Sequence, residues 1–270
     1  MLKQNFSVGK TYEFNVTSDQ ILDQEEPSQN QSLNQHIGTR YLFQTLSDSA
    51  EYKLIKVVYK QIVLRSSTKG SEVDYNSDLD TLGRRAKFGN LRNESFTMVF
   101  SPDGSVKSTA GLDQIVTHLA VKMAADSTEI PYYQNNLSKQ FNADVIRETL
   151  ESSFRVYPGK PVKVGDSWTI DTKIQMSIPV ENKTTYTLKE VKSGKATLTV
   201  RGTLLSKGAF VVAGKNTQTD LKGSNTGELI LDLNTGAIIS SHLRVDFFGK
   251  IDGKYNFEME AINEITGREL

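Results

Sequence analysis

The residue types that most often carry chemistry are sparse in this sequence. The three histidines, His36, His118 and His242, are far apart and lack the spacing of metal ligands, such as His-x-His or His-Glu-x-x-His. Cysteine is absent, which excludes disulfides, thiolate zinc sites and cysteine nucleophiles together. We therefore expect no catalytic residue, no metal and no cofactor.

The serine that follows Gly165 and Asp166 is the nearest approach to a hydrolase motif. It precedes alternating strand residues, whereas a nucleophile elbow needs a strand followed by a helix. Neither Gly-x-Gly-x-x-Gly nor a Walker loop is present, so no phosphate cradle is indicated. Carboxylates or histidines that converge only in the fold leave no such pattern, and an enzyme of unrecognised class stays as a second alternative.

A possible calcium loop is the remaining candidate for a metal site. Residues 74–80 read Asp-x-Asn-x-Asp-x-Asp, which alternates oxygen ligands in the required way. The sixth position, which needs glycine, is Leu79, and the twelfth, which needs glutamate, is Arg85. The mismatch favours a solvated acidic loop, and calcium binding stays open.

Charge and hydropathy limit the partners. Lys and Arg together number 32, as do Asp and Glu, so the formal net charge is zero and the chain has no basic surplus to neutralise phosphates. We expect no nucleic-acid partner. No run approaches the ~20 apolar residues of a membrane helix, so we expect no transmembrane segment.

Two copies of one nine-residue phrase organise the chain. Residues 162–170 read Val-Lys-Val-Gly-Asp-Ser-Trp-Thr-Ile, and residues 6–14 read Phe-Ser-Val-Gly-Lys-Thr-Tyr-Glu-Phe. A glycine before alternating apolar and polar residues is typical of a turn that leads into a half-buried strand. A second pair of turns, around Gly104 and Gly236, also matches. The phrase therefore predicts two related β-rich halves.

Period-two alternation predicts most of the strands. In the first half it covers residues 11–17, 33–46, 51–67 and the hairpin at 96–106, and in the second half residues 168–174, 184–191, 195–204, 209–212, 228–233, 237–248 and 254–265. Strands as long as ~13 to 16 residues accumulate twist, so we expect strongly curved sheets. Residues 19–31, 66–92 and 214–226 are polar and are predicted as loops.

Two amphipathic helices are predicted between the halves. Leu112, Ile115, Val116, Leu119 and Met123 form one apolar stripe of a helix that ends near residue 126. The second helix is predicted over residues 138–153, with Ser138 as N-cap and an apolar stripe that is made of Phe141, Val145, Ile146 and Leu150.

The expected fold class is mainly β (α+β), with two related antiparallel curved sheets or half-barrels and the two helices between them. We assign residues 1–109 to an N-terminal β half, 110–156 to a helical connector and 157–270 to a C-terminal β half. We expect the three segments to form one continuous structural unit.

The sequence resembles an uncharacterised family of exported proteins from the Bacteroidota, known only as a domain of unknown function. The resemblance lies in residues 9–12 (Gly-Lys-Thr-Tyr), 96–106 (Phe-Thr-Met-Val-Phe-Ser-Pro-Asp-Gly-Ser-Val), 157–158 (Tyr-Pro) and 164–168 (Val-Gly-Asp-Ser-Trp). It implies export and a place in the cell envelope, and it brings no activity. We expect a periplasmic or cell-surface protein whose signal segment lies outside this sequence, although an intact cytoplasmic protein would begin in the same way.

The leading functional hypothesis is a non-catalytic envelope protein that holds an apolar or amphiphilic, lipid-like ligand. A curved sheet capped by helices leaves a cavity, and ligand pockets are mostly apolar. The candidate ligand-binding residues are apolar or aromatic and lie on the predicted strands and helices: Tyr41, Phe43, Leu119, Met123, Phe141 and Trp168. The alternative is a scaffold protein that binds an envelope protein partner through its polar loops.

Overall fold

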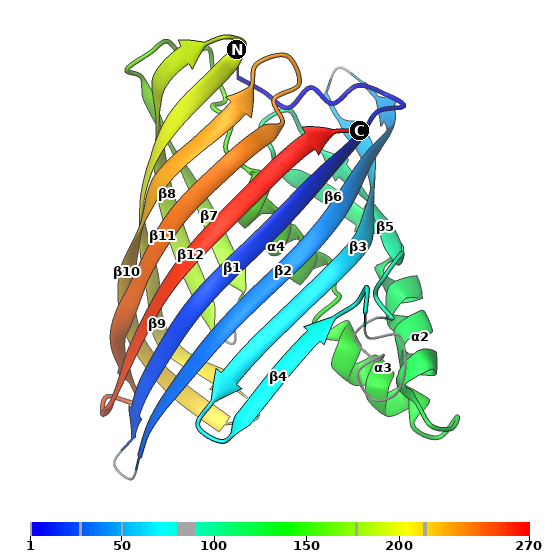
Figure 1. Ribbon diagram of the computed structural model, residues 1–270, viewed down its shortest axis with the longest axis vertical. Coiled ribbons are helices and arrows are strands. Elements are labelled where there is room, and N and C mark those ends of the chain that lie inside the picture. Colours follow the sequence, from blue (N-terminus) through cyan, green and yellow to red (C-terminus); the bar gives the residue numbers. More distant parts are fainter. Residues whose placement is uncertain (1, 27–28, 50, 80–89, 176–177, 213–214) are drawn as a thin grey trace.

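The computed structural model describes residues 2–26, 29–49, 51–79, 90–175, 178–212 and 215–270. Within these ranges the fold is mainly β, and one antiparallel sheet of twelve strands curves around one of three helices, while the other two lie to one side of it (Figure 1). The strands are β1 (Thr11–Glu26), β2 (Gln29–Asp48), β3 (Lys53–Thr68), β4 (Ser71–Asn76), β5 (Ser95–Phe100), β6 (Val106–Ala110), β7 (Ser167–Gln175), β8 (Pro179–Lys192), β9 (Lys195–Val212), β10 (Lys215–Asp232), β11 (Ile238–Ile251) and β12 (Tyr255–Glu269). The helices are α2 (Leu112–Met123), α3 (Ile130–Ser138) and α4 (Ala143–Phe154).

The two halves share one continuous sheet, so the expectation of two sheets was wrong. The strand order is β6-β5-β3-β2-β1-β12-β11-β10-β9-β8-β7, with β4 paired to β3 beside this path. The first and last strands join the halves, because β1 pairs with β12 from Tyr12–Glu269 to Gln24–Phe257. This pairing satisfies backbone groups that two separate sheets would leave at exposed edges.

The repeated phrase adopts the same local structure in both copies. Gly9 and Gly165 both have positive φ, 77° and 94°, in the turn before β1 and β7. The Gly9 N–H donates to Thr45 O at 3.0 Å, and the Gly165 N–H donates to Leu188 O at 2.8 Å. Each glycine therefore fixes its turn against the second strand of its own half, β2 or β8, as the repeated phrase predicts.

Three segments predicted as loops are largely strands. Residues 19–26 and 29–31 extend β1 and β2, residues 66–76 hold the end of β3 and all of β4, and residues 215–226 belong to β10. Their polar side chains gave no strand signal in the sequence. A strand with one solvent-exposed face needs few apolar residues once its neighbours supply the backbone hydrogen bonds. Of the predicted loop at 66–92, residues 80–89 lie outside the described part of the chain.

The helical connector contains one helix more than expected among its described residues. Residues 112–123 form α2 as predicted, and α3 is an additional helix without a buried residue, which is why periodicity gave no signal for it. The second predicted helix begins later, because the Asn142 side chain, and not Ser138, caps α4 by accepting a hydrogen bond from the Val145 N–H at 2.9 Å. Phe141 therefore precedes α4.

Helix α4 lies between the two strands that end the sheet. The Glu151 carboxylate accepts a hydrogen bond from the Val106 N–H of β6 at 2.8 Å. On the other side, Arg155, the C-cap residue of α4, donates to the Asp171 carbonyl of β7 at 3.5 Å. In the described part of the chain β6 and β7 do not pair with each other, and α4 occupies the gap between them.

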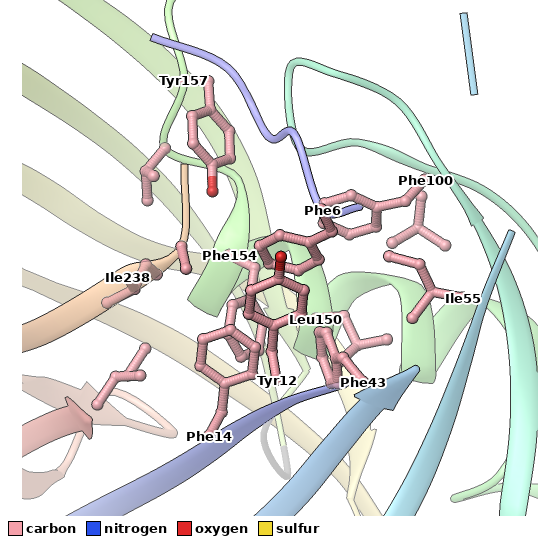
Figure 2. Close-up of a cluster of buried hydrophobic side chains, with 14 of the residues drawn as sticks. Phe6, Tyr12, Phe14, Phe43, Ile55, Phe100, Leu150, Phe154, Tyr157 and Ile238 are labelled. Carbon is pink, nitrogen blue, oxygen red and sulfur yellow. The ribbon is translucent and has the colours of Figure 1, made fainter. Parts of the chain in front are cut away.

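The main hydrophobic core packs α4 against the inner face of the sheet (Figure 2). The Phe154 ring lies 5.1 Å from both Phe14 and Phe43, and Phe6 from the N-terminal segment stacks on Tyr12 at 4.2 Å. Edge-to-face and offset ring contacts of this kind add to the burial of large apolar surfaces. They hold α4 against β1 and β2, near the middle of the strand order.

Candidate ligand-binding cavity

A cavity of about 240 Å³ lies on the inner side of the sheet, beside α4. Its wall comes from β1, β7 to β12, α4 and Val156, which follows α4 along the chain. At the roughly 30 Å³ that a water molecule occupies in the liquid, this volume corresponds to about eight water-sized groups. The space suits a small molecule or one segment of a longer chain.

The cavity wall is apolar with a few neutral polar groups. The apolar and aromatic residues are Val16, Val156, Ile174, Val180, Tyr186, Leu204, Leu229, Leu243, Val245, Phe247, Met259, Ala261 and Ile265, and the polar residues are Gln20, Ser152, Ser153, Asn182, Asn225, Ser241 and Asn263. No Asp, Glu, Lys, Arg or His stands among these described lining residues. Such a wall favours an apolar ligand over a charged one.

Two apolar clusters meet at the cavity. The main core contributes residues such as Tyr186, Leu229 and Ile265. A second cluster, which consists of Val180, Leu204, Leu221, Val245, Phe247, Met259 and Ala261, lies farther along the same strands. The cavity therefore lies where these two apolar clusters adjoin on the inner side of the sheet.

A buried carboxamide network borders the cavity on β8 and β10. Asn225 Nδ2 donates to Asn182 Oδ1 at 3.1 Å and to Thr184 Oγ1 at 3.2 Å. Asn182 Nδ2 in turn donates to Thr172 Oγ1 at 3.1 Å. Gly202 of β9 faces this network, and a Cβ at that position would overlap the Asn225 carboxamide. The missing side chain at residue 202 thus leaves the room that Asn225 occupies.

A second polar group lies on β1 and β12. Gln20 Nε2 donates to Ser18 Oγ at 2.9 Å, and Ser18 Oγ donates to Asn263 Oδ1 at 2.6 Å. Gln20 and Asn263 both line the cavity. The polar part of the wall therefore consists of amides and hydroxyls, which bind through hydrogen bonds without bringing a charge into the interior.

Tyr186 connects the cavity to the single tryptophan of the sequence. Its ring stacks on Trp168 at 5.9 Å with an angle of 22° between the planes, and Trp168 Nε1 donates to Val156 O at 3.0 Å. Burial raises the pKa of the Tyr186 hydroxyl well above its usual range, so this residue is neutral at physiological pH. Trp168 fluorescence is therefore placed to report on the cavity.

The candidate ligand-binding residues chosen from the sequence lie around the core. Phe43, Leu119 and Trp168 are buried in the main cluster, while Tyr41 and Phe141 pack against it and Met123 is partly buried at the end of α2. Desolvation raises the pKa of Tyr41 to about 12. None of the six lines the cavity, although the Trp168 ring stacks on Tyr186, which does line it. Their role in binding stays a prediction.

Sequence reasoning missed the two asparagines of the wall. Asn225 lies in a segment predicted as a loop, yet Leu221, Asn225, Leu229 and Leu231 are buried at even spacing while their neighbours are not. Glycines at residues 223 and 227 stand where apolar side chains would have completed this alternation. Counting glycine as an inward residue would have predicted the strand.

Many charged groups elsewhere in the described chain form ion pairs. The three histidines lie in separate pairs with carboxylates, namely His36 with Asp19, His118 with Glu94 and His242 with Glu264. On the opposite face of the sheet, a hollow of about 460 Å³ across β11, β12 and β1 to β4 contains the first of these pairs and also the Arg65–Asp74 and Arg244–Glu260 pairs. Exposed pairs of this kind stabilise the fold little.

The acidic run at residues 74–80 is also engaged in ion pairs. Asp78 lies 3.3 Å from Arg40 and 3.4 Å from Arg92, and Asp74 pairs with Arg65. Asp80 lies outside the described residues. In the ranges that the structure covers, no three His, Asp or Glu side chains are grouped so that they could hold a metal ion. Two arginines beside Asp78 disfavour a cation at that carboxylate.

Comparisons with known proteins bear on the fold. A family model described as a family of unknown function (DUF6263) matches residues 50–238. A search of the curated proteins finds no match. A solved structure titled "Lipid-protein interactions in lipovitellin" is similar with a TM-score of 0.56 and 11% identity, over 98% of this chain and 25% of that chain. This protein therefore spans about a quarter of the length of the lipovitellin chain.

Two bacterial structures are similar at a lower level. OccK7 (OpdD) from Pseudomonas aeruginosa has a TM-score of 0.29 and 8% identity, with 97% of this chain and 100% of that chain covered. An outer membrane channel from Pseudomonas putida F1 also has a TM-score of 0.29 and 8% identity, with 98% of this chain and 97% of that chain covered. Scores this low do not indicate a shared fold. Of the helices that the structure describes, none has both the length and the apolar character needed to cross a membrane.

Proposed function

The chain belongs to DUF6263, a family of unknown function, and we propose from its geometry that it is a non-catalytic binding protein for an apolar or amphiphilic ligand. The observation that carries the proposal is the neutral cavity between α4 and the inner face of the sheet. Its wall has the composition of a small-molecule site, mostly hydrophobic with a few convergent polar groups.

Two further observations support a binding role. The lining residues that the structure describes include no carboxylate, imidazole or amine for proton transfer, and the one ionisable group, the Tyr186 hydroxyl, is held neutral by burial. The fold is also similar to that of lipovitellin, in a structure whose title concerns lipid–protein interactions. At 11% identity this similarity speaks for the fold alone, so the ligand is inferred from the cavity.

We also propose that the protein acts in the bacterial envelope, as the resemblance to an exported family implies. Cell fractionation of a producing organism tests this part separately. Recovery of the protein in the cytosolic fraction alone would remove the envelope location and leave the binding proposal standing.

The binding proposal is tested by filling the cavity. Ser241 of β11 lines the cavity and is buried, whereas its neighbour Ser240 lies on the other face of the same strand and is partly exposed. The substitution Ser241→Phe places a phenyl ring in the cavity, and Ser240→Phe is its matched control. Binding of hexan-1-ol is measured by calorimetry and by the change in Trp168 fluorescence.

The expected affinity follows from the buried chain. Five methylene groups at ~0.8 kcal/mol each give about 4 kcal/mol, which corresponds to a Kd on the order of 1 mM. We expect at least tenfold weaker binding in Ser241→Phe and an unchanged Kd in Ser240→Phe. Mass spectrometry of an organic extract of the natively purified protein searches for the natural ligand. If no apolar molecule co-purifies and hexan-1-ol does not bind, the proposal fails.

A further inference from the structure

A second hollow lies on the inner face of the sheet, next to the candidate cavity. Its volume is about 400 Å³, and its apolar residues are Leu22, Leu33 and Phe257. The rest of its wall is polar and comes from β1, β2 and the end of β3 with the turn that follows. This is the end of the sheet opposite to the two chain termini (Figure 1). We call this space the mouth hollow.

The mouth hollow and the cavity occupy neighbouring positions on the same strands. On β1, Gln20 lines the cavity and Leu22 lines the mouth hollow. On β12, Met259 lines the cavity and Phe257 lines the mouth hollow, and Leu22 is paired with Met259 in the sheet. Residues two positions apart on a strand point to the same face and are separated by roughly 6.5–7 Å. About one layer of side chains therefore separates the two hollows.

The layer between the hollows is apolar. The Phe247 ring of the cavity wall meets the Phe257 ring of the mouth hollow edge to face, with 6.3 Å between the ring centroids. Phe247 is buried, whereas Phe257 is partly exposed. Rotation of the Phe257 ring breaks no hydrogen bond, and a hydrocarbon chain in its place restores the lost dispersion contacts. A chain that enters the mouth hollow can thus continue into the cavity.

Charge is distributed unequally along this path. The described residues that line the cavity include no charged side chain, whereas those that line the mouth hollow include one, Lys69 in the turn between β3 and β4. Lys69 is exposed and takes part in none of the ion pairs between described residues. An ionised head group would lose its hydration in the cavity at a high cost, whereas at the mouth hollow it stays in water beside a cation.

We propose that the cavity and the mouth hollow form one site for a single-chain amphiphile with an anionic head group, such as a long-chain carboxylate. The hydrocarbon tail lies along the inner face of β1 and β12 and reaches the cavity past Phe257. The head group stays at the mouth hollow, near the Lys69 amine. The inference rests on the proposed binding function and names the ligand class for that site.

Chain length tests the shared site in the wild-type protein. The cavity alone holds about eight water-sized groups, so a site limited to it gives affinities that stop rising beyond octan-1-ol. A site that continues into the mouth hollow should bind dodecan-1-ol more tightly, by about 2- to 4-fold for each of the four added methylene groups. Fourfold corresponds to complete burial. Titrations followed by Trp168 fluorescence measure both alcohols.

Charge at the mouth hollow tests the head group. Dodecanoate should bind at least about threefold more tightly than dodecyltrimethylammonium, which has the same chain length and the opposite charge. In 0.1 M salt, Lys69→Glu should weaken dodecanoate binding by about 3- to 10-fold and strengthen binding of the cation. The matched control is Lys250→Glu, because Lys250 is exposed on the outer face of β11 near the same end of the sheet. It should leave both affinities unchanged.

The outcomes separate this inference from the binding function. Equal affinities for octan-1-ol and dodecan-1-ol would overturn the shared site and leave a binding cavity in place. A dodecanoate affinity that Lys69→Glu does not change would overturn the assignment of an anionic head group. Failure of hexan-1-ol and of every longer probe to bind would overturn the binding function itself.

Discussion

Replacement of Phe154 by alanine should weaken the whole protein, because this ring joins α4 to the centre of the sheet. Phe154 is 4% exposed and contacts Phe14 of β1 and Phe43 of β2, both at 5.1 Å between ring centroids. Truncation of a buried phenylalanine removes apolar burial and leaves a cavity, which together cost about 3–5 kcal/mol. The packing of the Phe154 ring against Phe14 and Phe43 accounts for part of that cost.

The expected shift in melting temperature follows from chain length. At about 2.1 cal/mol/K per residue, 270 residues give an unfolding entropy of about 0.57 kcal/mol/K. Dividing the expected cost by this entropy gives a decrease in Tm of about 5–9 °C. The control is Phe248→Ala on β11, where the ring is 46% exposed and near Lys222, and where we expect a change below about 0.5 kcal/mol.

Urea unfolding followed by Trp168 fluorescence and by circular dichroism measures both variants. The Phe154→Ala protein should also bind hexan-1-ol more weakly, because Ser152 and Ser153 of the same helix line the cavity. If the two variants unfold at the same urea concentration, the packing of α4 against the sheet is not what stabilises this fold. If Phe154→Ala lowers the stability but leaves the affinity for hexan-1-ol unchanged, the position of α4 does not shape the cavity.

Two further predictions concern the turns and the buried tyrosines. Gly9→Ala and Gly165→Ala should each lower the free energy of unfolding by roughly 1–2 kcal/mol in thermal unfolding, since both residues have positive φ. The control Gly159→Ala, at an open position without positive φ, should change it very little. A large difference between Gly9→Ala and Gly165→Ala would contradict the equivalence of the two turns. Burial raises the pKa of Tyr41 to about 12 and raises those of Tyr59, Tyr157 and Tyr186. The unfolded chain therefore loses protons above about pH 10 that the folded chain keeps, and stability that is complete below pH 10 should fall as pH rises toward 12 and beyond. A spectrophotometric titration in which these four tyrosines ionise near pH 10 with unchanged circular dichroism would refute this.

Apolar patterning was a good guide to this fold where one face of an element is fully buried. The stripe from Leu112 to Leu119 predicted α2, and the two glycine turns predicted the equivalence of Gly9 and Gly165. Patterning failed where a strand is largely polar or carries inward glycines, as at residues 19–26, 29–31 and 215–226. It also gave no information on which strand ends pair, because the β1–β12 contact joins residues more than 200 positions apart.

The candidate site was harder to predict than the fold for a related reason. Large aromatic residues such as Phe43 and Trp168 were chosen because they bury much area, and they fill the interior for that same reason. A cavity forms where inward side chains are small, and small residues give no strong signal in a sequence. Asn182 and Asn225 become recognisable as a pair only when the register places β8, β9 and β10 side by side.

The position of the cavity follows from how the two halves are joined. Read across the sheet, β7 to β12 continue directly into β1, β2, β3, β5 and β6, so the helical connector has to return from one edge of the sheet to the other. It does so through α4, which is about twice as wide as the ~4.8 Å that separates paired strands, and the edges therefore stay apart. The sheet around α4 is filled by aromatic rings at one end, where Phe154 meets Phe14 and Phe43. Beyond that contact some inward residues of the C-terminal half are small, among them Ser241 and Ala261, and they border the cavity. A curved sheet whose edges are held apart by a helix thus leaves a neutral pocket on its inner side.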